Sequence, residues 1–181
     1  MTAQTGFVEL RTDRLVLRRF APSDAAPFAD YRSDPDVARY QSWSGYTLER
    51  AERFIRDMRS ADPGVPGEWF QFAAADTSND ALVGDVALRV DGKDVTRAEL
   101  GFSFAPEHQG KGYATEAVRG VIDFAFGPLD VATIRAVADA RNRRSIALLE
   151  RIGMSRTSTD RALFKGAWCD EHTYELRRDE R

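Results

Sequence analysis

Residues 109–114, read Gln-Gly-Lys-Gly-Tyr-Ala, have the composition of a loop that binds an anion. The segment before them alternates apolar residues with polar or small ones as far as Phe104, which predicts a strand with two unlike faces. After them, apolar residues recur at helical spacing as far as Phe126, so a helix is expected to begin near Gly112. Glycines let the backbone turn there, and the first helical N–H groups have no partner within the helix. With the positive end of the helix dipole, such N–H groups bind phosphate.

Two common phosphate-binding motifs do not fit this loop. A dinucleotide-binding turn needs Gly-x-Gly-x-x-Gly, but the sixth position counted from Gly110 is Thr115. A nucleoside-triphosphate loop needs Ser or Thr directly after Gly-Lys, where this chain has Gly112. A loop with glutamine first, glycine fourth and alanine sixth instead resembles the Arg/Gln-x-x-Gly-x-Gly/Ala segment of the GCN5-related N-acetyltransferases (GNAT), which holds the pyrophosphate of coenzyme A.

The resemblance extends over nearly the whole chain, and within the superfamily it points to the RimJ/RimL-type acetyltransferases of ribosomal-protein N-termini. Residues 12–18, Thr-Asp-Arg-Leu-Val-Leu-Arg, resemble their opening strand, and Ser23 with the following Asp resembles the next helix start. Asn142 and Ser145, spaced Asn-x-x-Ser, and residues 170–176, spaced Asp-x-x-x-Tyr-x-Leu, extend the match. The resemblance implies acetyl-coenzyme A as co-substrate and a primary amine as acceptor, joined by direct attack in a ternary complex.

Acetyl transfer from a thioester to an amine needs a neutral amine, a stabilised carbonyl oxygen and a proton for the departing thiolate. Glu99 is the candidate base or amine-orienting carboxylate, because it lies on the polar face of the central strand and a buried strand rarely carries a carboxylate. A structural ion pair with an arginine, or an edge position facing water, would also explain it. Ser145 is the candidate acid or hydrogen-bond donor for the thiolate, because a thiol of pKa about 8.5 needs little more in order to leave. Its alternative role is helix capping together with Asn142.

We expect coenzyme A to contact the protein mostly through the backbone. The resemblance assigns Asn142 to the pantetheine amide. Backbone N–H groups freed by a bulge around 102–104 are expected to stabilise the carbonyl oxygen, and Gly101 in mid-strand fits such a bulge. Arg144, in a cluster of three arginines, either meets the ribose 3′-phosphate or belongs to a solvated basic turn. The full predicted set is Phe102, Ser103, Phe104, Gln109, Gly110, Lys111, Gly112, Tyr113, Ala114, Thr115, Asn142 and Arg144.

The acceptor side is expected to include Trp43 and Tyr46 as well as Glu99. The two aromatic residues lie in an irregular stretch that, in the resembled family, is near the acceptor entrance; their alternative place is the core. The acceptor is either a protein N-terminal α-amine or a small amine such as an amino acid, a polyamine or an aminated antibiotic. His108 and Cys169 are not expected to be catalytic, since the resembled family transfers the acetyl group without an acyl-cysteine. From another functional class, the alternative is a protein that senses acyl-coenzyme A without turnover.

Short strands and helices must bring these residues together. Their order predicts an α/β (α+β) domain with a mixed central sheet and helices on both faces. The resemblance makes this a GNAT fold with about six to seven strands, mostly antiparallel, in which the strands of Phe104 and Val137 splay around the pantetheine arm. Ser23 and Thr47 are expected to cap helices. The predicted elements are a strand at 10–20, helices at 23–31 and 47–58, loops at 41–46 and 62–67, strands at 69–75, 81–90 and up to 104, a helix at 112–126, a strand at 133–139, a helix at 142–152, and a hairpin of strands at 154–161 and 172–177.

Size and composition fit one domain over residues 1–181, with 43% hydrophobic and 30% charged residues. No apolar run approaches the roughly 20 residues that cross a bilayer and no signal peptide is recognisable, so we expect a cytoplasmic protein without a membrane partner. One cysteine and two histidines predict neither a disulfide nor a metal site. A net charge of −3 predicts no nucleic-acid partner. The sequence leaves the oligomeric state open, and a homodimer is a candidate because dimers occur in similar proteins.

Overall fold

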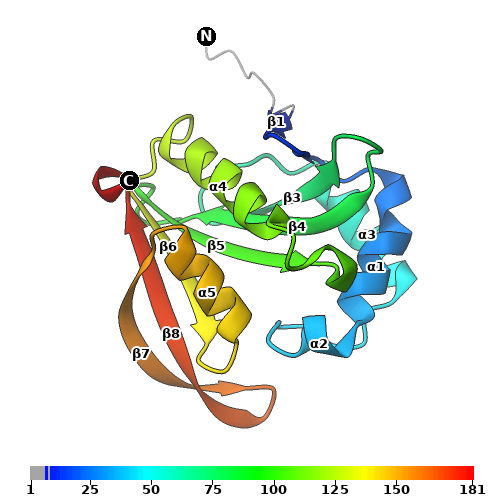
Figure 1. The fold of residues 1–181 in the computed structure, drawn as a ribbon. Coiled ribbons are helices and arrows are strands. Elements are labelled where there is room, and N and C mark those ends of the chain that lie inside the picture. The colour runs from blue at the N-terminus through cyan, green and yellow to red at the C-terminus, as the bar shows by residue number, and fades with distance from the viewer. Residues whose placement is uncertain (1–6, 8) are drawn as a thin grey trace.

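The computed structural model describes Phe7 and residues 9–181, whose strands form one eight-stranded sheet (Figure 1). The strand order is β1-β2-β3-β4-β5-β6-β8-β7, and every neighbouring pair is antiparallel except β5 and β6, which are parallel. The elements are β1 (Glu9–Arg11), β2 (Leu15–Arg18), α1 (Ala25–Ser33), α2 (Pro35–Ala38), α3 (Leu48–Met58), β3 (Trp69–Asp76), β4 (Leu82–Val90), β5 (Arg97–Phe104), α4 (Tyr113–Phe126), β6 (Thr133–Asp139), α5 (Arg143–Arg151), β7 (Ser155–Phe164) and β8 (Ala167–Arg177).

Helices lie on both faces of the sheet, as the order of elements predicts (Figure 1). Helices α4 and α5 pack on one face over a core that includes Phe72 from β3 and Val121 from α4. Helices α1 and α3 pack on the other face over a second core, which includes Phe28 and Ile55. Alternation along the strands supplies both cores, since Ala73 belongs to the second core and its neighbour Phe72 to the first. The mixed sheet with helices on both faces is therefore confirmed.

The predicted opening strand at 10–20 is wrong, because a turn divides it into β1 and β2. The turn is closed by a hydrogen bond from the Thr12 N–H to the Leu15 carbonyl, 2.9 Å long. Glu116 of α4 fixes this turn, because its carboxylate accepts from the Thr12 hydroxyl at 2.6 Å and from the Arg14 N–H at 2.7 Å. The extra strand raises the count to eight, above the predicted six to seven.

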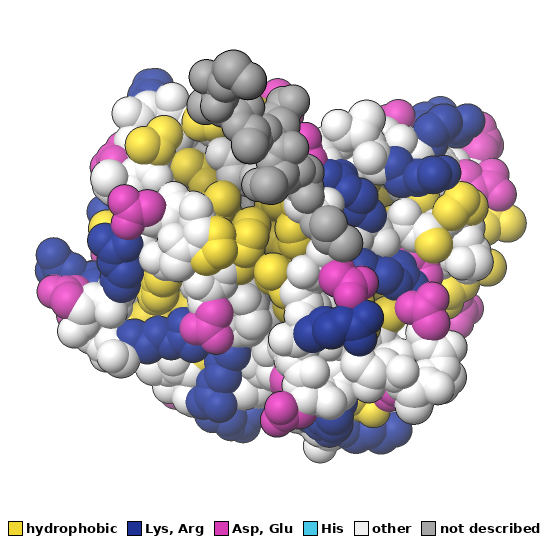
Figure 2. All heavy atoms as spheres, turned by 90° about the horizontal axis from the view of Figure 1, so that it is seen from above, with side chains coloured by type: hydrophobic (Ala, Val, Ile, Leu, Met, Phe, Trp, Pro, Cys, Tyr) yellow, Lys and Arg dark blue, Asp and Glu magenta, His cyan; other side chains and the backbone are white. Residues whose placement is uncertain are grey.

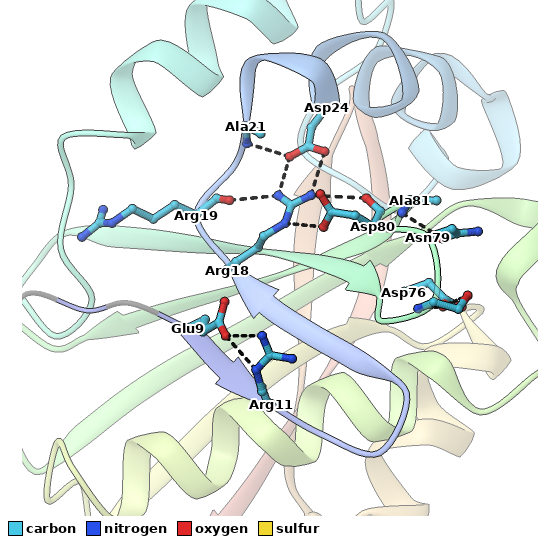
Figure 3. A network of polar contacts seen from close by, with 11 residues as sticks. Glu9, Arg11, Arg18, Arg19, Ala21, Asp24, Asp76, Asn79, Asp80 and Ala81 are labelled. Carbon is cyan, nitrogen blue, oxygen red and sulfur yellow. Dashed lines mark hydrogen bonds and ion pairs between the residues drawn. The ribbon is translucent and has the colours of Figure 1, made fainter.

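The start of α1 also differs from the prediction, whereas the start of α3 does not. Ser23 lies inside a short 3₁₀ turn, and Asp24 is the residue that caps this corner by accepting from the Ala21 N–H at 2.7 Å. Arg18 holds the same carboxylate at 2.7 Å and also contacts Asp80 in the loop between β3 and β4 (Figure 3). At α3 the predicted cap is confirmed, since the Thr47 hydroxyl accepts from the Arg50 N–H at 3.2 Å.

Strands β5 and β6 separate partway along their length. Their pairing runs from Arg97 opposite Thr133 to Leu100 opposite Ala136 and goes no further, although both strands continue. The bulge expected at Gly101 is absent, because β5 stays in regular register with β4 as far as Phe104. The register shift lies instead between β3 and β4, at Ala74 and Ala75. Backbone groups beyond Leu100 are thus left without a β6 partner by the splay rather than by a bulge.

The C-terminal hairpin of β7 and β8 is confirmed, and its tip reaches the other half of the molecule. Lys165 and Gly166 form the turn with φ of 49° and 78°, the left-handed pair of a two-residue hairpin turn. The Lys165 ammonium donates to the carbonyl oxygens of Ala38 and Trp43, each at 2.7 Å. The hairpin tip is therefore tied to the loop between α2 and α3 across the splay.

The surface seen from above carries Lys, Arg, Asp and Glu side chains interspersed, without one continuous basic surface (Figure 2). Within residues 9–181 and Phe7, no helix has the length and apolar character that crossing a membrane requires. The same residues contain no group of three or more His, Cys, Asp or Glu side chains that could hold a metal ion.

Candidate active site

A cavity of about 100 Å³ occupies the splay between β5 and β6. Strand residues Gly101 and Phe102 border it on one side, and Val137 on the other. The first turn of α5 adds Asn142 and Ser145, so the predicted Asn-x-x-Ser pair lies at the splay. The complete lining is Tyr40, Gln41, Leu100, Gly101, Phe102, Ala136, Val137, Ala138, Asp139, Asn142, Ser145, Leu149, Phe164 and Glu171.

The glycine loop has the conformation of an anion cradle. Gly110 and Gly112 have φ of 73° and 84°, a region that glycine enters without strain, and Gly112 is the N-cap of the 14-residue helix α4. A Cβ atom at Gly110 would meet nothing within 4 Å, so the cradle is open there. At Gly112 a Cβ would lie 3.2 Å from the Arg14 guanidinium, whose Nη1 donates to the Lys111 carbonyl at 3.0 Å. The loop is thus shaped by glycine and held from outside by Arg14, in the turn between β1 and β2.

Gln109 joins this loop to the two other parts of the site. Its amide Nε2 donates to the Phe104 carbonyl at 2.9 Å, and its Oε1 accepts from Arg144 at 2.8 Å. The end of β5, the loop and the start of α5 are therefore fastened by one side chain. The Thr115 side chain faces elsewhere: it accepts a 3.4 Å hydrogen bond from Arg151 and lines a separate groove along β1 and α4.

The first turn of α5 presents its polar groups to the cavity. The Asn142 Oδ1 accepts from the Ser145 N–H at 3.2 Å, so the asparagine is the N-cap, as the capping alternative requires. Both side chains are half-buried, and the Ser145 hydroxyl forms no hydrogen bond with any residue that the structure describes. Capping consumes the Asn142 oxygen but leaves its amide N–H₂ and the Ser145 hydroxyl available to a ligand.

Glu99 takes part in an ion pair and does not line the cavity. Its Oε2 accepts from the Arg89 Nη2 at 3.0 Å, across the β4–β5 pair. The structure therefore shows the ion-pair alternative. Ser103, on the same face, is buried opposite Asp85. Its backbone points to β4 and not to the splay, because the Ala105 N–H donates to the Val83 carbonyl at 3.0 Å and alternate residues of an antiparallel strand face the same neighbour.

Trp43 and Tyr46 surround a buried guanidinium instead of the cavity. The Arg32 group lies 3.8 Å from the Trp43 ring centre and 5.3 Å from that of Tyr46. Arg32 in turn contacts Asp85 at 3.1 Å, and Tyr31 donates to the same carboxylate. These two aromatic residues support the loop before α3 from the inside.

Tyr40 and Gln41, which sequence reasoning missed, carry the same loop to the cavity. The Gln41 amide donates to the Phe102 carbonyl at 3.3 Å, and the Tyr40 hydroxyl lies 3.5 Å from the Arg141 carbonyl. The local sequence does not distinguish these two residues from Trp43 as ligand contacts. The distinction depends on the buried Arg32, which draws the Trp43 side chain inward. Glu171 was missed too, since its place at the cavity depends on the pairing of β8 with β6.

Asp139, at the end of β6, is held by Arg141. The guanidinium contacts the carboxylate through two hydrogen bonds, Nε to Oδ1 at 2.9 Å and Nη2 to Oδ2 at 2.6 Å. The hydrogen bond from Arg141 lowers the pKa of Asp139, against the opposing effect of burial. Of the three clustered arginines, Arg141 thus binds a carboxylate and Arg144 binds Gln109.

Comparison with known proteins gives a consistent answer. A sequence model of the acetyltransferase (GNAT) domain matches residues 14–155. The uncharacterized N-acetyltransferase p20 of Bacillus licheniformis is 30% identical over 169 residues, covering 92% of this chain and 94% of that protein. A GNAT-family acetyltransferase from Bacillus anthracis superimposes with a TM-score of 0.83 at 26% identity, covering 96% and 100% of the two chains. RimJ of Mycobacterium smegmatis, solved with CoA-disulfide, shares the fold with a TM-score of 0.80 at 20% identity, over 95% and 87%.

Proposed function

The chain belongs to the GNAT acetyltransferases, and from this we propose that it moves an acetyl group from acetyl-coenzyme A to a primary amine by direct attack in a ternary complex. The observation that carries the proposal is the cavity in the splay, which brings Gly101 and Phe102 of β5 together with Asn142 and Ser145 of α5. Such a gap, next to an anion cradle, accommodates an extended thioester arm with its phosphates outside.

The residues around the glycine loop fit the coenzyme. We assign the pyrophosphate to the backbone N–H groups of residues 109–114, because Gly110 is open and the dipole of α4 favours an anion there. Phe102 and Phe104 would contribute backbone N–H groups that the splay leaves without a β6 partner, since their carbonyl oxygens already accept from Gln41 and Gln109. Ser103 lies between them but pairs with β4, so no direct contact is assigned to it. Lys111, which is exposed, and Arg144 supply positive charge near the pyrophosphate. Thr115 lines the separate groove, so it would contact the coenzyme only where the far end of the coenzyme bends over α4.

Ser145 is proposed to donate a hydrogen bond to the departing sulfur. A thiolate whose conjugate acid has a pKa of about 8.5 is a good leaving group, so a hydroxyl donor at this position is sufficient. The Asn142 amide N–H₂ is proposed to hold a carbonyl of the pantetheine arm, since its oxygen is already used as the helix cap. Backbone N–H groups at the splay would stabilise the charge that develops on the thioester oxygen.

For the acceptor we propose a protein N-terminal α-amine, with a small amine as the second candidate. An α-amine with a pKa near 8 costs about 1.4 kcal/mol to deprotonate at pH 7, whereas a lysine amine costs about 4.6 kcal/mol. A site without a strong base therefore favours the α-amine. Trp43 and Tyr46 would act by fixing the loop of Tyr40 and Gln41, and Glu99, held by Arg89, would reach the amine only through water.

Thiol release from acetyl-coenzyme A, measured with a panel of peptides and small amines, tests this function. Turnover with at least one class of amine is the expected result, and the better class identifies the acceptor. Coenzyme A binding by calorimetry without turnover across the panel would contradict the proposal and favour a sensor of acyl-coenzyme A.

A further inference from the structure

Glu171 of β8 lines the same cavity as Asn142 and Ser145. Its side chain is half-buried, and among the residues that the structure describes no Lys, Arg or His lies within ion-pair distance of it. Glu99 differs, because Arg89 already neutralises it at 3.0 Å. A half-buried carboxylate without a cation is unfavourable unless something else pairs with it. Its position at the cavity makes a ligand the natural partner.

The neighbours of Glu171 increase its preference for a cation. Cross-strand pairing puts Asp139 of β6 on one side and Asp160 of β7 on the other, so all three side chains lie on the same face of the sheet. Arg141 neutralises Asp139 through two hydrogen bonds, whereas Asp160 accepts only from the Ser158 hydroxyl, at 2.7 Å. Two neighbouring carboxylates, Glu171 at the cavity and the exposed Asp160 beside it on β7, thus have no cation among the described residues. In the described residues no three such groups are close enough to hold a metal ion.

We infer that Glu171 is the amine-binding residue of the site: its carboxylate receives the ammonium group of the acceptor and then orients the neutral amine toward the thioester. The inference rests on the proposed function, because it takes the cavity as the place where thioester and amine meet. A primary ammonium fits the position better than a bulkier cation, since the cavity holds only about 100 Å³ and is also lined by Tyr40, Gln41 and Phe164.

Glu171 binds the amine but does not serve as its base. At pH 7 roughly one α-amine in ten, with a pKa near 8, is already neutral in water, so no protein base is needed to supply the nucleophile. Water therefore takes the first proton. The amine nitrogen then bonds to the carbonyl carbon and loses a second proton to water, the C–S bond breaks with its electron pair on sulfur, and the sulfur takes up one proton from solvent beside the Ser145 hydroxyl.

The substitution Glu171→Gln tests the inference, because it removes the charge and keeps the shape. With a peptide or amine that the wild type accepts, kcat/KM for the amine is expected to fall at least tenfold, the size of a lost charge-assisted hydrogen bond, mostly through a higher KM. The KM for acetyl-coenzyme A and the Kd of coenzyme A should stay within twofold. Asp160→Asn is the matched control, since it removes a neighbouring charge that does not line the cavity, and it should change the amine KM less than threefold.

Three results would distinguish a failure of the Glu171 inference from a failure of the proposed function. Wild-type turnover with an unchanged amine KM in Glu171→Gln would overturn the role of Glu171 alone. An equal loss for amine and acetyl-coenzyme A would also overturn it, because it would indicate a structural role. No wild-type turnover on any amine would reject the proposed function and this inference with it. If the glutamine variant melts below the assay temperature, Glu171→Asp replaces it: a carboxylate drawn back by one methylene should still raise the amine KM and spare that of acetyl-coenzyme A.

Discussion

Two polar clusters on the α1–α3 face of the sheet differ in how completely their charges are paired. Around Asp85, which is 1% exposed, the carboxylate accepts from Arg32, Tyr31 and Gln71. Burial and the charge of Asp85 raise the pKa of Tyr31 well above its ordinary value, so the phenol stays a donor. Around Glu171, which is half-buried, the one cation that the described residues supply is Arg141, and it pairs with the buried Asp139 and not with Glu171.

Whether the charges of a cluster are paired distinguishes structural residues from ligand-binding residues better than residue type does. Arg32 is enclosed by aromatic rings, with the Phe28 ring centre at 4.3 Å and the Trp43 ring centre at 3.8 Å, and it leaves no room for a ligand. Its charge is paired with Asp85, and in this sense the cluster is saturated, although the Arg32 Nε is the only buried side-chain polar atom of the described residues without a hydrogen-bond partner. Substitutions in the saturated cluster around Asp85 should therefore change the stability of the fold. Substitutions in the unsaturated cluster around Glu171 should change the kinetics, because its free carboxylate is proposed to bind a ligand.

The largest expected effect is on the saturated cluster. Asp85→Ala leaves the Arg32 charge buried without its partner, which should lower the free energy of unfolding by about 3–5 kcal/mol in a urea titration. Asp80→Asn is the matched control, because Asp80 pairs with Arg18 but its side chain is 74% exposed, and the loss should be below about 1 kcal/mol. Equal losses of stability in the two variants would contradict the structural role assigned to the saturated cluster.

Next in size is the glycine cradle, where binding should suffer more than folding. Gly112→Val forces a β-branched residue to φ of 84° and against Arg14, and is expected to weaken coenzyme A binding at least tenfold by calorimetry. The left-handed conformation itself should cost about 1–2 kcal/mol of stability. Gly166→Val has a similar φ of 78° in the hairpin turn, so it should show the same stability loss with unchanged coenzyme affinity. Equal affinity in both variants would remove the cradle from the coenzyme site.

How much the sequence predicts depends on the range of the contacts that decide each feature. The α4, β6 and α5 segments follow from local spacing and glycines, and they agree with the structure to within a residue or so at each end. The turn between β1 and β2 does not, because Glu116, far along the chain, fixes it. Trp43 shows the same limit: an aromatic residue in a loop looks like a ligand contact until Arg32 is seen beneath it. Glu171 becomes a candidate only once strand order puts β8 beside β6.

A smaller effect is expected at the sulfur end of the cavity. Ser145→Ala removes one hydroxyl hydrogen bond to the leaving thiolate, so kcat should fall about tenfold, with the Kd of coenzyme A within twofold. The melting temperature should not fall, since the helix cap uses the Ser145 backbone N–H and not its hydroxyl. Asn142→Ala is the contrasting variant, because losing the cap itself should cost about 1 kcal/mol of stability. A large stability loss in Ser145→Ala would place this serine with the saturated cluster.

The smallest effect concerns Asp139, the one carboxylate of the cavity that resembles the saturated cluster. The hydrogen bond from Arg141 lowers the pKa of Asp139 in the folded protein. The pair therefore stabilises the fold at pH values above the ordinary carboxyl pKa, and this contribution is lost as the pH falls below that pKa toward the lower pKa of the folded protein. Arg141 is 62% exposed, so Arg141→Gln should lower the free energy of unfolding only slightly at pH 7, and the difference from wild type should shrink on acidification to about pH 3. Chemical denaturation at both pH values measures this difference. A gap that persists at low pH would mean that Arg141 acts through packing, and the pairing of Asp139 would then no longer distinguish it from Glu171.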